Sequence, residues 1–368
     1  MNCLYNEEGE RYFAASNTKD GFVSYFDEIF SDSSCDRVFI LKGGPGVGKS
    51  TFMKKLFKMS NDMGYSCELF HCSSDPLSLD GIIVKEKRAA VIDGTNPHSA
   101  EPVLAGAREI IVDLGRAWNI DKLYKNRSEI SELSQKKKKC YSECYGFLHA
   151  KSVMDRLIYN LVFPHILFDK LEKSAQRLSN SLFKEHKGKK SAVRKIRITN
   201  AVSSLGKIRL FTFEKMAEYC IFIKEPYSNS RLAHFYMRSI YDTAIMNGID
   251  THVSFNPQNK GEIDAVYFPE IRTSISLYNE DFVAECDKNL KRCKIINCTR
   301  FIDSKAFSAL KPLRKFYLKL SESMEKQALE CLEKAGNVHM DTEKIYRQCT
   351  NYKTVEKIEN EYFKMILQ

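Results

Sequence analysis

Short apolar runs bounded by polar residues recur along the first 115 residues of the chain. The clearest lie at residues 36–42, 66–72, 88–93 and 109–112. Runs of four to seven residues suit strands that are buried in a parallel sheet. After the first run, residues 51–63 have the pattern of a helix. This order of strands and helix predicts an α/β lobe with a parallel sheet.

The second half of the chain repeats this pattern. Residues 37–42 match residues 219–224 at an offset of 182, and from Gly64 to residue 93 the offset is 184 without a gap. The run at 109–112 matches the run at 294–297. The repeat predicts two tandem αβα lobes with parallel sheets, each followed by long helices.

Two stretches have apolar residues at helical spacing, residues 120–182 and 307–368. They predict long amphipathic helices, and residues 188–194 combine glycine with charge as a linker does. The helices after the first lobe either pack on its sheet or form a lid that closes over a ligand. The predicted order is a first lobe at 1–120, a helical hairpin at 121–187, a second lobe at 188–305 and C-terminal helices at 306–368.

The net charge of +10 has one source. Residues 131–200 contain sixteen basic and six acidic side chains, and the remainder of the chain is neutral. Such a block binds an acidic polymer or an acidic protein partner, or it is a solvated helical face with a linker. No aromatic residues interleave the second basic run, at 184–197, as stacking on single-stranded nucleic acid requires.

Composition indicates in which cellular compartment the protein is expected. The chain has no apolar run of about 18 residues, which a membrane-spanning helix needs. Acidic residues stand near the N-terminus where a signal peptide has a basic segment, so we expect a cytoplasmic protein. The 12 cysteines include no C-x-x-C pair, which favours reduced thiols over a zinc site.

The strongest motif follows the first apolar run. It matches G-x-x-x-x-G-K-[ST] between a strand and a helix, the context that a phosphate-binding loop needs. Glycines allow successive amides to point at phosphate oxygens, and the helix adds its positive N-terminal end. The lysine would contact the β- and γ-phosphates and the serine would bind Mg²⁺. The predicted nucleotide-binding residues are Gly43, Gly44, Pro45, Gly46, Val47, Gly48, Lys49, Ser50 and Thr51.

Two carboxylates are candidates for the same site. Asp93 ends the apolar run at 88–93, as a Walker B aspartate does, and is predicted to hold Mg²⁺ together with Ser50. Gly94 follows it, so the adjacent glutamate that is the general base of many ATPases is missing. Asp75 follows the preceding run at 66–72 by three residues and is the nearest substitute, which makes Lys49, Asp75 and Asp93 the candidate catalytic residues.

The second copy of the motif has lost its chemistry. The offset of 182 places Glu225 at Gly43, Ser230 at Gly48, Arg231 at Lys49 and Leu232 at Ser50. Asn259 and Leu277 replace Asp75 and Asp93, whereas Asp80 is kept as Asp264. We therefore expect Asp80 to be a turn or cap residue, and the second lobe to be a pseudo-NTPase lobe.

These motifs resemble an uncharacterised bacterial family of duplicated P-loop ATPases, within the P-loop nucleoside triphosphate hydrolase superfamily. The resemblance is carried by residues 39–50, 71–76, 78–81 and 91–98. It implies two tandem P-loop-type lobes, ATP binding and presumed hydrolysis, with no defined acceptor. Members carry a phosphate loop in each half, and the loss of the second loop here departs from that pattern.

Three functions fit the sequence. The favoured one is a Mg²⁺-dependent ATPase switch with ATP in the first lobe. A kinase for a nucleotide or small metabolite is the first alternative, although no acceptor-binding constellation is evident. The second is a nucleotide-gated nucleic-acid binder that uses residues 136–197. The sequence predicts no oligomeric state.

Overall fold

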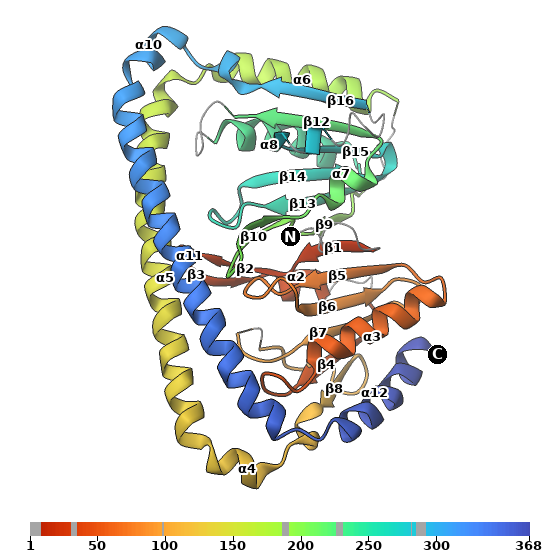
Figure 1. Ribbon diagram of the computed structural model, residues 1–368. Helices are drawn as coiled ribbons and strands as arrows, with labels where there is room; N and C mark the ends of the chain where they lie inside the picture. Colours follow the sequence, from red (N-terminus) through yellow and green to blue (C-terminus); the bar gives the residue numbers. More distant parts are fainter. Residues whose placement is uncertain are drawn as a thin grey trace. The chain divides into compact units, whose positions relative to one another are not determined.

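The computed structural model describes residues 9–30, 35–97, 99–185, 191–225, 231–280, 282–284 and 292–368 (Figure 1). The chain forms two compact α/β units, each built from separate segments. Unit 1 comprises Met1–Gly146, Ala201–Leu210 and Gln327–Gln368, and unit 2 comprises Phe147–Asn200 and Phe211–Lys326. The two units are defined by which residues contact one another in space. The four segments predicted from the sequence are defined by changes in the pattern of apolar residues, and they stay a prediction.

Unit 1 has a six-stranded sheet in the order β1-β5-β6-β7-β4-β8. A hairpin of β2 (Ala15–Thr18) and β3 (Gly21–Ser24) and a short helix, α2 (Phe26–Phe30), lie between β1 and β4 in the chain. The strands of the sheet are β1 (Glu10–Phe13), β4 (Arg37–Lys42), β5 (Cys67–His71), β6 (Leu79–Val84), β7 (Ala89–Asp93) and β8 (Glu109–Asp113).

The sheet is mostly parallel, but β6 runs antiparallel to both β5 and β7. The prediction of a wholly parallel sheet is therefore wrong at this strand. Only residues 72–78 join β5 to β6 and only residues 85–88 join β6 to β7. A parallel crossover needs about a dozen residues, so these short links permit only antiparallel neighbours.

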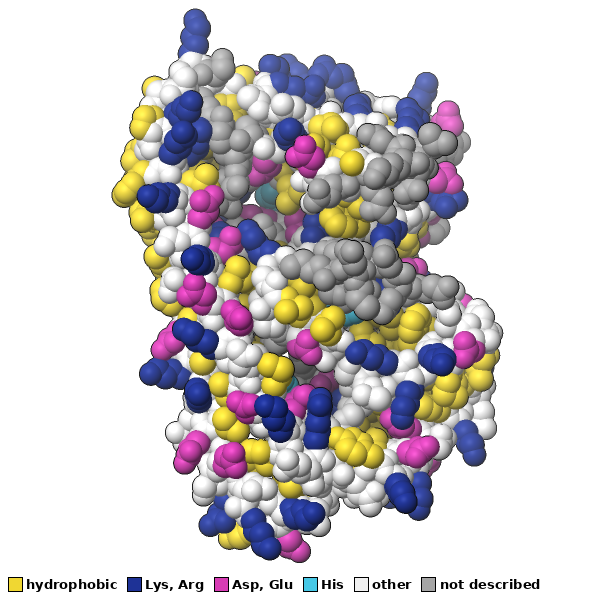
Figure 2. All heavy atoms as spheres, in the orientation of Figure 1, with side chains coloured by type: hydrophobic (Ala, Val, Ile, Leu, Met, Phe, Trp, Pro, Cys, Tyr) yellow, Lys and Arg dark blue, Asp and Glu magenta, His cyan; other side chains and the backbone are white. Residues whose placement is uncertain are grey.

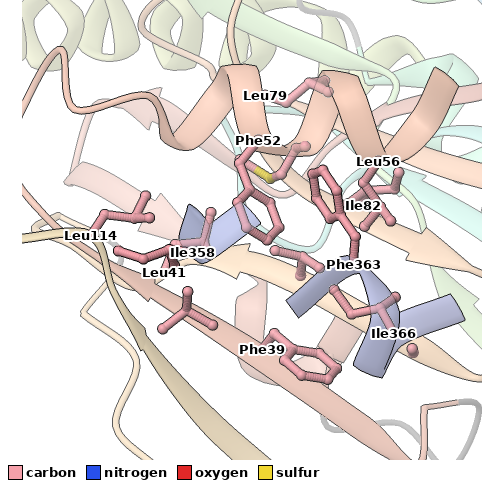
Figure 3. Close-up of a cluster of buried hydrophobic side chains, with 14 of the residues drawn as sticks. Phe39, Leu41, Phe52, Leu56, Leu79, Ile82, Leu114, Ile358, Phe363 and Ile366 are labelled. Atoms are coloured by element: carbon pink, nitrogen blue, oxygen red, sulfur yellow. The ribbon is translucent and has the colours of Figure 1, made fainter. Parts of the chain in front are cut away.

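Two helices cover one hydrophobic core of unit 1. Helix α3 (Lys49–Asp62) follows β4, and α12 (Tyr352–Leu367) comes from the other end of the chain. Phe363 of α12 meets Phe52 of α3 edge to face, with the ring centroids 4.7 Å apart, and Phe39 of β4 lies in the same core (Figure 3). The C-terminal helix is thus an integral part of the unit that carries the glycine loop.

Unit 2 repeats the topology of unit 1 strand for strand. Its sheet order is β16-β12-β15-β14-β13-β9, with β14 antiparallel to β13 and β15. The strands are β9 (Arg194–Ile196), β12 (Tyr219–Lys224), β13 (Thr251–Phe255), β14 (Ile263–Phe268), β15 (Thr273–Leu277) and β16 (Arg292–Asn297). The helices α7 (Thr212–Met216) and α8 (Leu232–Met246) also belong to unit 2. A hairpin of β10 (Asn200–Ser203) and β11 (Gly206–Arg209) repeats the hairpin of β2 and β3 in chain order, but its residues Ala201–Leu210 belong to unit 1.

Local geometry repeats as well. Arg88 and Arg272, 184 residues apart, both adopt positive φ, and each forms an ion pair with a carboxylate of the chain, Asp36 and Glu218 respectively. Strand β8 pairs with β4 in the same register in which residues 293–297 of β16 pair with β12, so β8 corresponds to residues 293–297 at an offset of 184. The sequence match of residues 109–112 with 294–297 differs from this by one residue. The duplication thus extends to the turns that connect the strands.

The helical segments follow the sequence prediction. Residues 120–182 form α4 (Ile120–Lys125), α5 (Arg127–Val162) and α6 (Phe168–Phe183). The C-terminal stretch forms α10 (Ser304–Ala309), α11 (Lys311–Gln348) and α12. In the described residues, 3₁₀ turns occur at Leu114–Ala117 (η1), Phe163–His165 (η2), Pro269–Ile271 (η3) and Cys298–Phe301 (η4). In the described part of the chain, no helix is both long and apolar enough to cross a bilayer.

Truncating Phe363 to alanine should destabilise unit 1 by about 3–5 kcal/mol, because a buried aromatic side chain is lost and a cavity remains. The matched control is Met365→Ala on the same helix, since Met365 is 37 % exposed and Phe363 only 5 %. Urea unfolding followed by the fluorescence of Trp118, the single tryptophan, measures both variants. Equal losses in the two variants would contradict the packing of α12 described above.

Candidate functional site

The glycine loop joins β4 to α3 in unit 1, as the motif predicts. Gly46 and Gly48 have φ of +71° and +109°, a region that residues with a Cβ rarely adopt. Gly44 has a different constraint, because a Cβ there would come within 2.9 Å of the Tyr346 ring. The loop therefore needs glycine at these positions for backbone conformation and for close packing.

Lys49, the first residue of α3, points back over the loop. Its Nζ donates hydrogen bonds to the carbonyl oxygens of Gly43 and Gly44, at 2.9 and 3.0 Å. The same nitrogen lies 3.6 Å from Oδ2 of Asp93, and the two side chains are only 12 % and 14 % exposed. The structure thus brings together the lysine and the Walker B candidate from opposite ends of the segment 49–93.

Asp93 is held at the end of β7 beside β4. Burial raises the pKa of its carboxyl, Asp80 raises it further, and the nearby Lys49 ammonium lowers it. Thr95 donates two hydrogen bonds to Oδ1, from its backbone N–H at 2.9 Å and its hydroxyl at 2.6 Å. A buried carboxylate with a desolvation cost of this kind gains stabilisation from a cation, and Mg²⁺ prefers such oxygen ligands.

Ser50 is hydrogen-bonded to the first residue of β6, which precedes Asp80 in the chain. The Ser50 Oγ accepts a hydrogen bond from the Leu79 N–H at 3.0 Å, which places the next residue, Asp80, beside the loop. Asp80 is buried, and its charge acts on Asp93. The expectation that Asp80 is only a turn or cap residue is wrong, because it lies within β6 and next to the site.

Asp75 lies in the connection between β5 and β6. Its Oδ2 accepts a hydrogen bond from the Ser78 hydroxyl at 2.6 Å, and its Oδ1 accepts one from the Leu77 N–H at 3.3 Å. Its charge acts on His339 of α11. The carboxylate thus shapes this turn, and its catalytic role stays a prediction.

The first-turn amides of α3 are hydrogen-bond donors that the helix itself cannot satisfy. The N-cap residue is Gly48, which has no side chain to accept from them. Within the described residues, no other side chain accepts from the amides of Lys49, Ser50 or Thr51. The loop and the helix therefore present a set of N–H groups suited to an anion.

Aromatic residues from distant parts of the chain pack on the loop. The rings of Trp118 and Tyr346 lie 5.7 Å apart and both approach Gly44. Tyr352, the first residue of α12, donates from its hydroxyl to the Gly46 carbonyl at 2.9 Å. These residues could not be predicted from the sequence, since nothing in the motif indicates which helix covers it.

A lysine of the 136–139 run also belongs to this region. Lys137 is half-buried, whereas Lys136, Lys138 and Lys139 are exposed. Its Nζ lies 3.1 Å from Nδ1 of His339. Arg197, in the second basic run, is buried and cannot contact a polymer. On the face in Figure 2, Lys and Arg side chains are interspersed with Asp and Glu.

The counterpart of the glycine loop in unit 2 lies partly outside the described residues, because 226–230 are not among them. The described helix corrects the alignment predicted there. Buried Phe52, Met53, Leu56 and Ser60 of α3 correspond, at an offset of 184, to buried Tyr236, Met237, Ile240 and Ala244 of α8. The two extra residues therefore enter within the loop, before the helix.

This alignment pairs Ser50 with His234 and Lys49 with Ala233, instead of Leu232 and Arg231. A shared hydrogen bond supports it, since Nδ1 of His234 accepts from the Ile263 N–H at 2.9 Å as Ser50 accepts from Leu79. The lysine and serine of the motif are still lost in unit 2. Unit 2 is therefore still predicted to lack the phosphate-binding residues. The residues that stand in their places are Ala233 and His234, and not Arg231 and Leu232.

Unit 2 fills the corresponding anion position with its own carboxylate. Oε1 of Glu225 accepts from the Ala233 N–H, in the first turn of α8, at 2.8 Å. Arg231 is held by Glu262, with Nε and Oε1 2.8 Å apart, and lies over the Tyr159 ring. A cavity of about 380 Å³ at this edge is lined by four carboxylates and two cations, Asp155, Glu225, Glu262, Asp264, Lys224 and Arg231. This charge balance opposes a triphosphate.

The stability of unit 2 should fall as the pH is lowered from 6.5 towards 4. Burial lowers the pKa of His234 to about 4, so the unfolded chain binds a proton in this range while the folded chain does not. The expected loss from this group is on the order of 1–3 kcal/mol. In His234→Gln, urea unfolding followed by circular dichroism should show a smaller loss between pH 7 and 4.5. An identical pH dependence in both proteins would contradict the buried, neutral state of His234.

The resemblance to duplicated P-loop ATPases stays a prediction. Comparison of the chain with protein-family models, curated proteins and solved structures finds no match. What the site binds therefore has to be inferred from the glycine loop, Lys49, Ser50 and Asp93 of this chain.

Proposed function

We propose that unit 1 binds ATP with Mg²⁺ at residues 43–51 and hydrolyses it, so that the protein is a nucleotide-dependent ATPase switch. The observation that carries the proposal is the position of Lys49. Its ammonium lies over the first two carbonyls of a glycine loop, within 3.6 Å of a buried carboxylate at the end of the adjacent strand. A phosphate group would compete with these carbonyls for the same ammonium.

Three features of unit 1 support a phosphate ligand. Gly46 and Gly48 adopt positive φ, as glycines do in loops whose successive backbone amides bind an anion. The first-turn amides of α3 are available to an anion and lie at the positive end of a 14-residue helix. The side chain of Lys49 adds a full positive charge next to them.

The carboxylates supply the metal-binding part of the proposal. Ser50 is hydrogen-bonded to the residue before Asp80, and the charge of Asp80 acts on Asp93. Mg²⁺ in nucleotide sites is usually held by one or two carboxylates and by phosphate oxygens. Magnesium there would offset the desolvation that raises the pKa of Asp93. In this proposal Ser50 and Asp93 hold the ion, and Asp80 supports it through its charge.

Unit 2 is proposed to bind no nucleotide. Glu225 already accepts from the first turn of α8, and a second anion there would be repelled by its charge. Leu277 and Ala233, which correspond to Asp93 and Lys49, cannot bind magnesium or phosphate through their side chains. The role of unit 2 is then structural, or it responds to the nucleotide bound in unit 1.

Lys49→Ala should weaken ATP binding by about 10- to 100-fold, since charge-assisted hydrogen bonds contribute roughly 1.5–3 kcal/mol. Trp118, which lies against Gly44, provides a fluorescence readout of binding. The matched control is Lys58→Ala, which removes an exposed lysine from the same helix and should leave the affinity unchanged. Equal ATP affinity of Lys49→Ala and the control would refute the site.

Calorimetric titration with ATP and Mg²⁺ should give one bound nucleotide per chain. Glu225→Gln should not create a second site, because unit 2 also lacks counterparts of Lys49 and Asp93. Two equivalent sites in the wild-type protein would contradict the assignment of unit 2. Release of free phosphate in the same mixture distinguishes hydrolysis from transfer to an acceptor.

A further inference from the structure

The cations around the glycine loop are not equivalent. Lys42 donates to the carbonyls of Gly94 and Ala100, at 3.0 and 2.8 Å, and forms an ion pair with Glu101 at 2.7 Å. Arg347 forms an ion pair with Glu343 on its own helix, at 2.8 Å. Both are therefore held by ion pairs with Glu101 and Glu343. Among the described cations, Lys49 lies over the loop carbonyls, and Lys137 is close enough for the charge of Lys49 to act on it.

Lys137 is set apart from its neighbours by its position on α5. It is half-buried, while Lys136, Lys138 and Lys139 are exposed. Successive residues of a helix point about 100° apart, so only one of the four lysines faces inward. The run is thus a solvated helical face with a single lysine directed at the protein.

The structure fixes α5 and α11 on two sides of the site. One turn after Lys137, the Tyr141 hydroxyl donates to Ser74 Oγ at 3.0 Å, next to Asp75. One turn after His339, Glu343 packs its backbone against Gly46, 3.0 Å from where a Cβ would lie. The contact between Lys137 and His339 therefore spans the space between the end of β5 and the glycine loop.

His339 orients Lys137 and does not neutralise it. Burial and the Lys137 charge lower the pKa of His339 to about 4, so the ring is neutral and Nδ1 accepts the ammonium hydrogen. Among the described residues, no carboxylate lies within ion-pair distance of Lys137. Burial lowers the pKa of Lys137, and the charge of Lys49 lowers it further. A partly buried ammonium with a second ammonium nearby is stabilised by a multiply charged anion.

We propose that Lys137 contacts the terminal phosphate of the nucleotide bound in unit 1, as a second phosphate-binding cation supplied by α5. The inference rests on the proposed function. Lys49 would lie beside the β- and γ-phosphates, and Lys137 approaches from the side of Asp75, beyond the loop. Only a triphosphate reaches this position, so Lys137 distinguishes ATP from ADP. Loss of the γ-phosphate also removes the ligand that links α5 to the loop.

The test compares ATP and ADP binding, each with Mg²⁺, in Lys137→Ala and in the control Lys138→Ala. Lys137→Ala should bind ATP about tenfold more weakly, with ADP affinity unchanged, because one charge-assisted contact to the γ-phosphate is lost. Its ATP turnover should fall as well, and Lys137→Arg should restore part of both. Lys138→Ala should match the wild-type protein. Lys137→Met, which keeps most of the side-chain length, carries the same expectation should the alanine variant not fold.

Two results overturn the inference while leaving the proposed function intact. One is wild-type ATP affinity and turnover in Lys137→Ala; the other is an equal loss of ATP and ADP affinity, which would place Lys137 away from the γ-phosphate. A wild-type protein that binds no ATP overturns both proposals. Nucleotide-selective weakening confined to position 137 supports the assignment, since a merely structural lysine would affect both nucleotides alike.

Discussion

A helix that begins directly after a tight loop exposes backbone N–H groups that need an acceptor, and this constraint governs both units. In unit 2 the acceptor comes from the chain, because the Glu225 carboxylate binds the Ala233 amide. In unit 1 Gly48 stands at the N-cap, and within the described residues no side chain fills that role for Lys49, Ser50 or Thr51. The same fold thus satisfies its donors internally in one copy and is proposed to satisfy them with phosphate in the other.

The duplication separates what the fold needs from what the chemistry needs. The antiparallel strands β6 and β14, the positive φ of Arg88 and Arg272, and the buried carboxylates Asp80 and Asp264 occur in both copies. The hydrogen bond from the first residue of β6 to Ser50 survives in unit 2 with a histidine as acceptor. Lys49 and Asp93 have no such counterparts, and their ion-pair distance of 3.6 Å is particular to unit 1. The proposed chemistry therefore rests on the residues that only one copy retains.

Much of the fold followed from the sequence because its strands are short apolar runs and its helices have clear periodicity. Strands β4, β5, β7 and β8 and helix α3 were predicted within one or two residues. Strand β6 was not predicted at all, because Asp80 and Gly81 interrupt its apolar residues. The placement of Asp80 followed from that error. The helix that covers the loop was also unpredictable, since Tyr346 and Tyr352 lie some 300 residues from Gly44 and no local pattern connects them. Within the loop of the second copy, the alignment failed because the change of offset from 182 to 184 shows that two residues are inserted but not where they lie.

Amide hydrogen exchange in the presence and absence of ATP and Mg²⁺ tests the central claim most directly, since it reports on the loop amides themselves. If the N–H groups of unit 1 bind phosphate, exchange should slow markedly at residues 43–51, while the first turn of α8 at residues 232–236 stays unchanged. Unchanged exchange at residues 43–51 at millimolar ATP, or equal slowing in both units, would contradict the account.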